Sequence, residues 1–314
     1  MKIFGKDDGL GVAAVLEMHH TSGIVIREDA VRVFQSIGTL VALSAFGCAP
    51  SSLTLEVTEG APGEDLPGDT GSVDEPEPEW RIDSLHHARE PQGMQTTIYF
   101  ICYLLEEYGS DPLATYLLDE RELYVVPCVN PDGYEYNRQQ SPGGGGLWRK
   151  NRRNNGNGTF GVDLNRNYPF QWGGSGSSGN SSSEVYRGSA PASEPEIQAM
   201  IQFIDGREFQ TALSVHTYSD LWLAPWGYVG QYPPAWAEIG EIGDLAVADN
   251  GYVHGPASLI LYEADGVTFD YEGASYVNMN LYLEANQTVA LTLFDTAHMQ
   301  EVRIYHNYTP GTDM

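Results

Sequence analysis

The stretch FQTALSVHTY, residues 209–218, decides the fold because it has the composition of a buried strand and carries a histidine near its end. Its β-branched and aromatic residues are typical of strands. Similar stretches predict further strands at 79–85, 122–129 and 280–285. Strands that alternate with helices are typical of α/β proteins, so we expect a mixed, mostly parallel central sheet with helices on both faces.

Three segments predict helices around these strands. Residues 94–109 have apolar side chains at helical spacing and end at a glycine. Residues 193–206 open with Ser193 and have Glu196 three residues later, which predicts a capping box. Residues 295–308 predict a terminal helix.

The chain is strongly acidic. Among its 314 residues, 43 Asp and Glu face 16 Lys and Arg, which gives a formal net charge of −27. A nucleic-acid binder needs a basic face, and the sequence shows none, so we expect no nucleic-acid partner. Hydrophobic residues make up 41% of the chain, which is enough for a sizeable core.

Three cysteines, Cys48, Cys102 and Cys128, are too few for a disulfide framework. Cys102 lies in the apolar run of a predicted helix. Cys128 ends a predicted strand, just before NPDG at 130–133, which predicts a turn. We therefore expect buried thiols at positions 102 and 128 and no bridge.

The N-terminal part differs in composition from the rest. Residues 1–48 would be a leader with an export signal. The apolar run 33–49, at the end of this leader, resembles the apolar region of such a signal and is too short for a membrane span. The small residues around Cys48 resemble a bacterial lipoprotein cleavage site. We therefore expect the chain to be exported and to be extracellular, periplasmic or a surface lipoprotein. Any attachment to a membrane would be through a lipid or signal anchor only. Residues 49–79, rich in Pro, Gly and acid, predict a flexible linker. Residues 80–314 would form the main domain.

The segment HARE, residues 87–90, follows directly after a predicted strand. His87 and Glu90, three residues apart on a tight turn, can converge on one cation. His216 could be a third ligand, since functional residues of such sheets gather at strand ends. Two histidines and one glutamate with an open fourth position are typical of catalytic zinc. Taken alone, the pair His87 and Glu90 would be ordinary surface residues, and His216 would be a histidine of the core. Taken together, the three residues lead us to the hypothesis of a zinc site.

Several other polar residues need an explanation. Arg149, Arg152, Arg153 and Arg166 form a basic cluster in this acidic chain. The planar guanidinium suits carboxylates, so the cluster indicates an anionic substrate group, or else internal ion pairs. Glu284 ends an apolar strand, where an acid is costly to bury, so it is either a general base or a structural residue.

Eight segments, in this order, resemble the zinc carboxypeptidases of the carboxypeptidase A type. The resemblance covers about residues 80 to 290 and suggests a bacterial secreted or lipoprotein member. The segments are HARE (87–90), PCVNPDGYEY (127–136), LWRKNR (147–152), GVDLNRNY (161–168), YRGSAPASEPE (186–196), SVHTYSDLWLAPWGY (214–228), LYEADGVTFD (261–270) and LYLEAN (281–286).

The resemblance implies a role for individual residues. His87, Glu90 and His216 would hold one Zn²⁺ per chain, with His86 a neighbour and not a ligand. Glu284 would be the general base that takes a proton from water, and Arg149 would stabilise the oxyanion. The substrate-binding residues would be Asn165, Arg166 and Tyr262 at the terminal carboxylate, Arg89 and Tyr218 along the cleft, and Phe269 and Asp270 at the floor of the side-chain pocket.

The resemblance implies a metallocarboxypeptidase that cleaves the last peptide bond of peptides or proteins with a free C-terminus. Phe269 at the pocket floor favours apolar or neutral last residues. The alternatives are a cell-wall peptide-trimming carboxypeptidase of the same fold and a non-catalytic peptide-binding lipoprotein. The family has outer strands and a helix before HARE; here the leader and linker stand in their place. We therefore expect a sheet without its N-terminal edge strands and with an exposed edge. The oligomeric state stays open.

Overall fold

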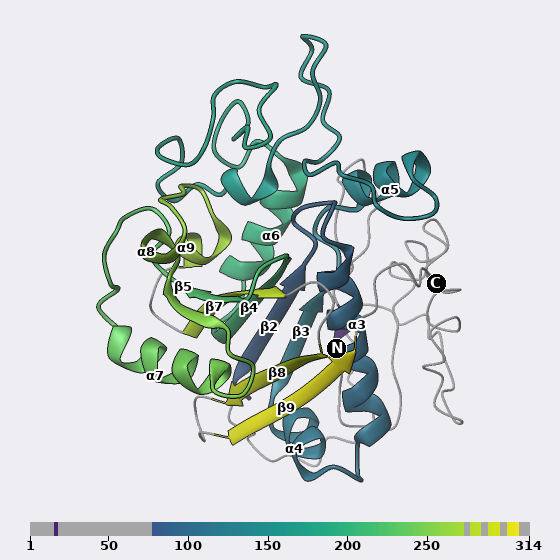
Figure 1. Cartoon of the computed structure of the whole chain (residues 1–314), viewed down its shortest axis with the longest axis vertical. Helices are drawn as coiled ribbons and strands as arrows, with labels where there is room; N and C mark the ends of the chain where they lie inside the picture. Colours follow the sequence, from purple (N-terminus) through teal and green to yellow (C-terminus); the bar gives the residue numbers. More distant parts are fainter. Residues whose placement is uncertain (1–15, 18–76, 273–276, 284–287, 296–299, 308–314) are drawn as a thin grey trace, which may run out of the picture.

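A seven-stranded sheet forms the centre of the protein (Figure 1). The computed structural model describes residues 16–17, 77–272, 277–283, 288–295 and 300–307. The strand order is β1-β3-β2-β4-β7-β5-β6. The strands are β1 (Leu16–Glu17), β2 (Glu79–Ser84), β3 (Glu122–Val126), β4 (Phe209–Thr217), β5 (Leu221–Ala224), β6 (Val253–Pro256) and β7 (Val277–Leu283).

The sheet is mixed and mostly parallel, as predicted. Strands β2–β3, β2–β4, β4–β7 and β5–β6 pair in parallel, whereas β1–β3 and β5–β7 pair antiparallel. A second sheet contains only the antiparallel pair β8 (Thr288–Asp295) and β9 (Gln300–Asn307). The prediction of a terminal helix over 295–308 is therefore wrong for the described residues 300–307. Their β-branched and aromatic residues pair with β8, and this pairing overrides the local helical spacing.

Helices cover both faces of the sheet, which confirms the expected layers. Alternate side chains of a strand point to opposite faces. In β3, Leu123 and Val125 pack into a core shared with helices α3, α4 and α7. Tyr124 and Val126 of the same strand pack into a second core with α6. The helices are α3 (Pro91–Glu107), α4 (Pro112–Glu120), α5 (Pro131–Gln140), α6 (Pro195–Asp205), α7 (Trp236–Val247), α8 (Ala257–Ile260), α9 (Thr268–Glu272) and the 3₁₀ turn η1 (Leu164–Arg166).

Two local predictions fail at helix starts. The NPDG segment begins helix α5 and is not a turn: the Asn130 side chain accepts from Gly133 N, and proline is well suited to the first helical position. In α6 the N-cap is Glu194, which makes no side-chain cap hydrogen bond, so the Ser193 capping box does not form. Ser193 Oγ donates to Glu194 instead, and Glu196 faces Asn151.

The two cysteines at positions 102 and 128 differ from each other. Cys128 is a free thiol, as expected, and burial raises its pKa to about 12. Cys102 is disulfide-bonded, though not to Cys128, so the prediction of a free thiol is wrong there. The apolar periodicity around Cys102 indicates burial but carries no information about a second sulfur atom.

The open edge of the sheet is partly covered. Leu16 and Glu17 of β1 pair with Val125 and Tyr124 of β3, a contact that the sequence did not predict. Among the described residues, these two are the whole of the sheet beyond β3. Nowhere in the described ranges is a helix both long and apolar enough to cross a membrane. The predicted export signal and Cys48 lie outside the described residues.

Candidate metal centre

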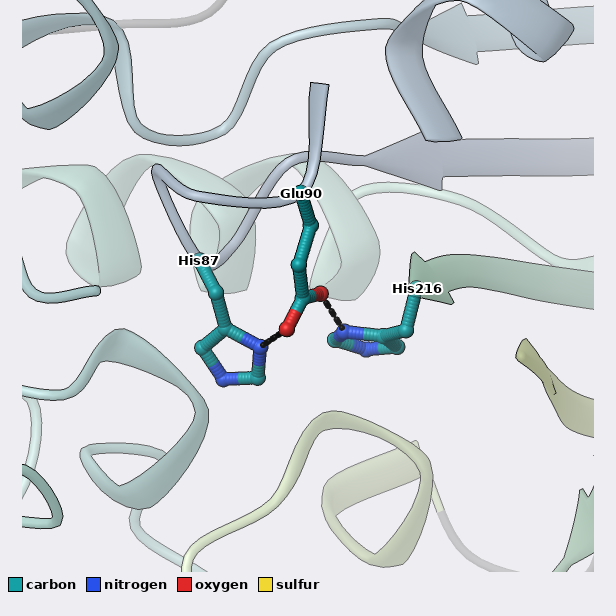
Figure 2. Close-up of side chains that lie close together, drawn as sticks. All are labelled: His87, Glu90 and His216. Carbon is teal, nitrogen blue, oxygen red and sulfur yellow. Dashed lines mark hydrogen bonds and ion pairs between the residues drawn. The ribbon is translucent and has the colours of Figure 1, made fainter. Parts of the chain in front are cut away.

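The candidate ligands come from the ends of two neighbouring parallel strands. Strand β2 ends at Ser84, the chain turns through 85–90, and α3 begins at Pro91. Strand β4 lies beside β2, with Ser84 opposite Val215, so His216 follows at the same edge of the sheet. His87, Glu90 and His216 therefore converge, as Figure 2 shows.

The three side chains are buried and in contact. The Glu90 carboxylate lies between the two imidazoles, with Oε1 at 2.8 Å from His87 Nδ1 and Oε2 at 2.9 Å from His216 Nδ1. Their possible ligand atoms all lie within 4.8 Å of one another. His216 is fully buried, and His87 and Glu90 are 2% and 4% exposed. This is the set that the sequence predicts as a metal site.

The charges of the three groups suit one divalent cation. Burial opposes ionisation of Glu90, but the neighbouring His87 and His216 outweigh it and hold its pKa below the usual range. Burial lowers the pKa of His216 more than Glu90 raises it, which favours the neutral imidazole. A carboxylate and neutral imidazole nitrogens are zinc ligands, so the residues present fit a single Zn²⁺.

Asp163 joins this set to Arg149, and the sequence analysis did not single it out. Its Oδ1 lies 3.3 Å from His87 Nε2, and its Oδ2 accepts from Arg149 Nε and an Arg149 terminal nitrogen at 3.0 and 2.9 Å. Burial raises the pKa of Asp163, but Arg149 and His87 reverse this and hold it well below the usual range. Arg149 also lies 3.9 Å from Glu90 Oε1, which puts its guanidinium beside the ligands.

The turn that follows Asp163 presents Asn165 and Arg166. Asp163 Oδ1 accepts from Asn165 N at 3.1 Å and caps the 3₁₀ turn η1. The Arg166 guanidinium donates to Gly176 O, to Asn165 O and to the Tyr262 hydroxyl, the last at 3.1 Å. The structure thus brings together the predicted carboxylate-binding residues, although Tyr262 lies 96 residues away in sequence.

Arg166 differs from the other arginines of the basic cluster. Arg149 and Arg153 make ion pairs with Asp163 and Glu194. Arg152 lies over three aromatic rings, those of Tyr136, Trp148 and Phe160. In the part of the chain that the structure describes, no carboxylate lies within ion-pair distance of Arg166, which is only 4% exposed. A planar guanidinium suits carboxylates and phosphates, so Arg166 is the arginine of this cluster that could pair with an anion from outside the described residues.

The segment after Tyr262 forms an apolar cluster. Phe269 is 4% exposed and packs with Leu223, Ala264 and Val267. The neighbouring Asp270 is fully buried, and its two oxygens accept from Gly227 N and Tyr228 N at 2.8 and 2.9 Å. Burial raises the pKa of Asp270 to about 7 despite these bonds. Both side chains therefore hold this segment against residues 223–228.

Of the remaining predicted residues, the structure describes Tyr218 and Arg89. Tyr218 follows β4 directly and is 77% exposed. Arg89 is partly exposed and pairs with Glu184 at 3.4 Å. Glu284 lies outside the described residues. Strand β7, which ends at Leu283, pairs with β4 so that Tyr282 lies opposite His216 and Leu283 opposite Thr217.

A buried polar group lies beneath the ligands on the α6 side of the sheet. Asp83 accepts from Arg81 Nε and Ser214 Oγ at 2.9 and 2.6 Å, and its Oδ1 lies 3.4 Å from His86 Nδ1. His86 is fully buried and stacks on His216, its Nε2 lies 3.0 Å from the Tyr168 hydroxyl, and burial lowers its pKa to about 3. The alternation of Arg81 and Asp83 with Trp80 and Ile82 was a signal for this polar face.

Comparisons with known proteins agree with this geometry. A family model described as zinc carboxypeptidase matches residues 52–300. Carboxypeptidase A1 of Rattus norvegicus is 32% identical over 238 residues, which is 73% of this chain and 55% of the rat protein. The crystal structure of thrombin activatable fibrinolysis inhibitor (TAFI) superimposes with a TM-score of 0.61 at 30% identity, covering 68% of this chain and 56% of that chain. Carboxypeptidase A of Helicoverpa armigera gives 0.59 at 28% identity, covering 68% and 54%. This chain spans about half the length of the curated relatives it matches.

Proposed function

Because this chain belongs to the zinc carboxypeptidase family, we propose that it hydrolyses the C-terminal peptide bond of peptides or proteins with a free C-terminus and releases apolar or neutral residues. His87, Glu90 and His216 would hold one Zn²⁺ per chain. When bound there, the zinc would act as a Lewis acid and lower the pKa of water toward ~7.

The observation that carries the proposal is Arg166. Its buried guanidinium is held by neutral oxygens alone among the described residues, and the Tyr262 hydroxyl lies on it at 3.1 Å. Arg166 lies in the 3₁₀ turn η1 that Asp163 caps, and Asp163 also contacts His87. A fixed carboxylate-binding group next to a metal centre selects the last residue of a chain, because only that residue has a free carboxylate.

The other residues have separate roles in the proposal. Asn165 and Tyr262 would bind the same carboxylate as Arg166. Arg149, close to the ligands, would stabilise negative charge that develops on the scissile carbonyl oxygen, an effect of about 3 kcal/mol for one such donor. Glu284 would take the proton from water as general base. Arg89 and Tyr218 would contact the substrate on the far side of the scissile bond.

The packing of residues 261–271 supports an apolar or neutral last residue. Phe269 lies in an apolar cluster with Leu223 and Val267. The acid beside it, Asp270, uses both oxygens for backbone N–H groups, and burial raises its pKa to about 7, so that it is only partly ionised near neutral pH. It is therefore poorly placed to pair with a lysine or arginine side chain of the substrate.

The test uses the full chain, loaded with zinc and assayed with a blocked dipeptide that ends in Phe. We expect one zinc per chain and release of Phe that a chelator abolishes. Arg166→Met should raise KM for this substrate strongly, since it removes the charge but keeps much of the side-chain length. Arg138→Met, which alters an exposed arginine of α5 paired with Glu135, is the matched control and should leave KM unchanged.

The two ways of failing have different meanings. Zinc binding without release would refute the proposed reaction and point to a peptide-binding role or to a cell-wall peptide as substrate. Release that Arg166→Met leaves unchanged would refute the role of Arg166 in binding the carboxylate. Export is also part of the proposal; the apolar run 33–49 supports it, and fractionation of producing cells tests it.

A further inference from the structure

Thr268, the first residue of α9, contacts Asn165 across 103 positions of sequence. Its backbone N–H donates to Asn165 Oδ1 at 3.0 Å, and its hydroxyl lies 3.1 Å from the same oxygen. Both residues are buried, Thr268 at 0% and Asn165 at 2% exposure. The contact therefore joins the segment that carries Tyr262 to the turn that carries Arg166.

The backbone N–H decides which way the Asn165 amide faces. A backbone N–H can only donate, so the amide atom opposite it must be the oxygen. The amide nitrogen Nδ2 then faces away from Thr268. Across the residues that the structure describes, Nδ2 donates to no protein acceptor, and it is not one of the fully buried side-chain atoms that lack a partner, so it can still be reached by a ligand.

The Thr268 hydroxyl is itself held in place. It lies 3.1 Å from His86 Nε2, and the Tyr168 hydroxyl approaches the same nitrogen at 3.0 Å. His86 and Tyr168 are both fully buried. The position of the Thr268 hydroxyl is therefore fixed by the buried residues His86 and Tyr168, and not by the exposed residues around Tyr262.

We propose that Thr268 is a positioning residue for recognition of the substrate's terminal carboxylate: it fixes the Asn165 amide so that Nδ2 donates to that carboxylate beside Arg166. This inference rests on the proposed function and adds to it. Thr268 itself does not touch the substrate. Without the hydroxyl, one hydrogen bond still holds the amide oxygen, so the amide gains freedom to turn and its nitrogen is less often aimed at the ligand.

The test compares Thr268→Val, which removes the hydroxyl at nearly constant shape, with Thr268→Ser, which keeps it. The substrates are the blocked dipeptide ending in Phe as free acid and as amide. We expect Thr268→Val to raise KM for the free acid roughly three- to tenfold, the worth of one neutral hydrogen bond, with kcat changed much less. The preference for acid over amide should fall by the same factor, and Thr268→Ser should restore it.

Two further measurements separate positioning from a structural defect. Calorimetric binding of the free-acid dipeptide to the metal-free protein should weaken by the same factor in Thr268→Val. Thr115→Val in α4, whose hydroxyl donates to Asp111 O, is the matched control and should leave KM and binding unchanged. If the valine variant does not fold, Thr268→Ala takes its place.

The outcomes distinguish this inference from the proposed function. A wild-type chain that does not prefer the acid over the amide refutes the proposed function, and the inference with it. A wild-type preference that Asn165→Ala abolishes but Thr268→Val leaves intact overturns the inference alone. A preference that Asn165→Ala leaves intact overturns it as well, because Asn165 then does not bind the carboxylate.

Discussion

Replacing Asp163 by asparagine should weaken zinc binding and destabilise the fold at the same time. The carboxylate is fully buried and serves three groups: His87 Nε2 at 3.3 Å, the Arg149 guanidinium at 2.9 Å and Asn165 N at 3.1 Å. An asparagine has the same shape as Asp163 but no charge, and an NH₂ group replaces one of the two carboxylate oxygens. That group must then face either Arg149 or His87, and against Arg149 a donor would meet donors.

The magnitudes follow from these contacts. A hydrogen bond to a charged group contributes about 1.5–3 kcal/mol, and removing one partner of a buried ion pair costs about 3–5 kcal/mol. Asparagine keeps one acceptor oxygen, so we expect a loss of unfolding free energy of about 2–3 kcal/mol in the metal-free protein. Loss of the carboxylate behind a ligating histidine typically weakens metal affinity about 10- to 100-fold.

Zinc affinity is measured by competition with a chelator, and stability by urea denaturation of the metal-free chain. Asp111→Asn is the control: Asp111 caps α4, its side-chain hydrogen bonds are with Leu113 N, Ala114 N and the Tyr103 hydroxyl, and asparagine is an equally good N-cap. It should leave zinc affinity unchanged. If Asp163→Asn binds zinc as tightly as the wild type while the ligands are intact, the contact between His87 Nε2 and Asp163 Oδ1 has no part in metal binding.

Two further predictions test the ligand set and the buried acids. His87→Ala should lose zinc in the chelator competition, whereas His86→Ala should keep most of it; the reverse result would exclude His87 as the ligand. Burial, helped by the charge of Glu194, raises the pKa of Glu196 from 4.5 to about 7. The folded state then holds a proton that the unfolded state has lost, so Glu196 lowers the free energy of unfolding as pH rises from about 4.5 to about 7, by up to about 3 kcal/mol. Glu196→Gln should flatten this fall, measured by urea denaturation of the metal-free chain at about pH 5 and about pH 8, and an unchanged slope would contradict the raised pKa.

The sequence predicted the strands and layers well because short runs of β-branched and aromatic residues indicate buried strands, and a 3.6-residue apolar period indicates helices. Strands β2, β3 and β4 lie within a few residues of their predicted ranges, because each is buried on both faces of the sheet over most of its length. The start of α5 was missed because Asn130 and Pro131 suit a helix N-terminus as well as a turn. Strand β9 was missed because its pairing with β8 is not visible in its own sequence.

The ligand set was predictable for a topological reason. His87 follows β2 and His216 lies near the end of β4, and parallel neighbours end at the same edge of the sheet. Asp163, in contrast, lies on a loop between strands, and no periodicity predicts where a loop will pass. Asp163 Oδ2 accepts from Arg149 because the fold places the 3₁₀ turn η1 next to the ligands, and the sequence does not show this placement.

The contacts at Asp163 and Thr268 explain how loops can form a site that needs fixed distances. Loops have few backbone hydrogen bonds of their own, so their side chains must be held by groups elsewhere. Here Asp163 holds the turn with Asn165 and Arg166 against His87, and Thr268 holds the segment with Tyr262 and Phe269 against that turn. Each is a buried polar residue whose partners lie in other elements. Changing either should therefore alter ligand or substrate affinity as well as stability, and this effect on affinity separates the two residues from ordinary core positions.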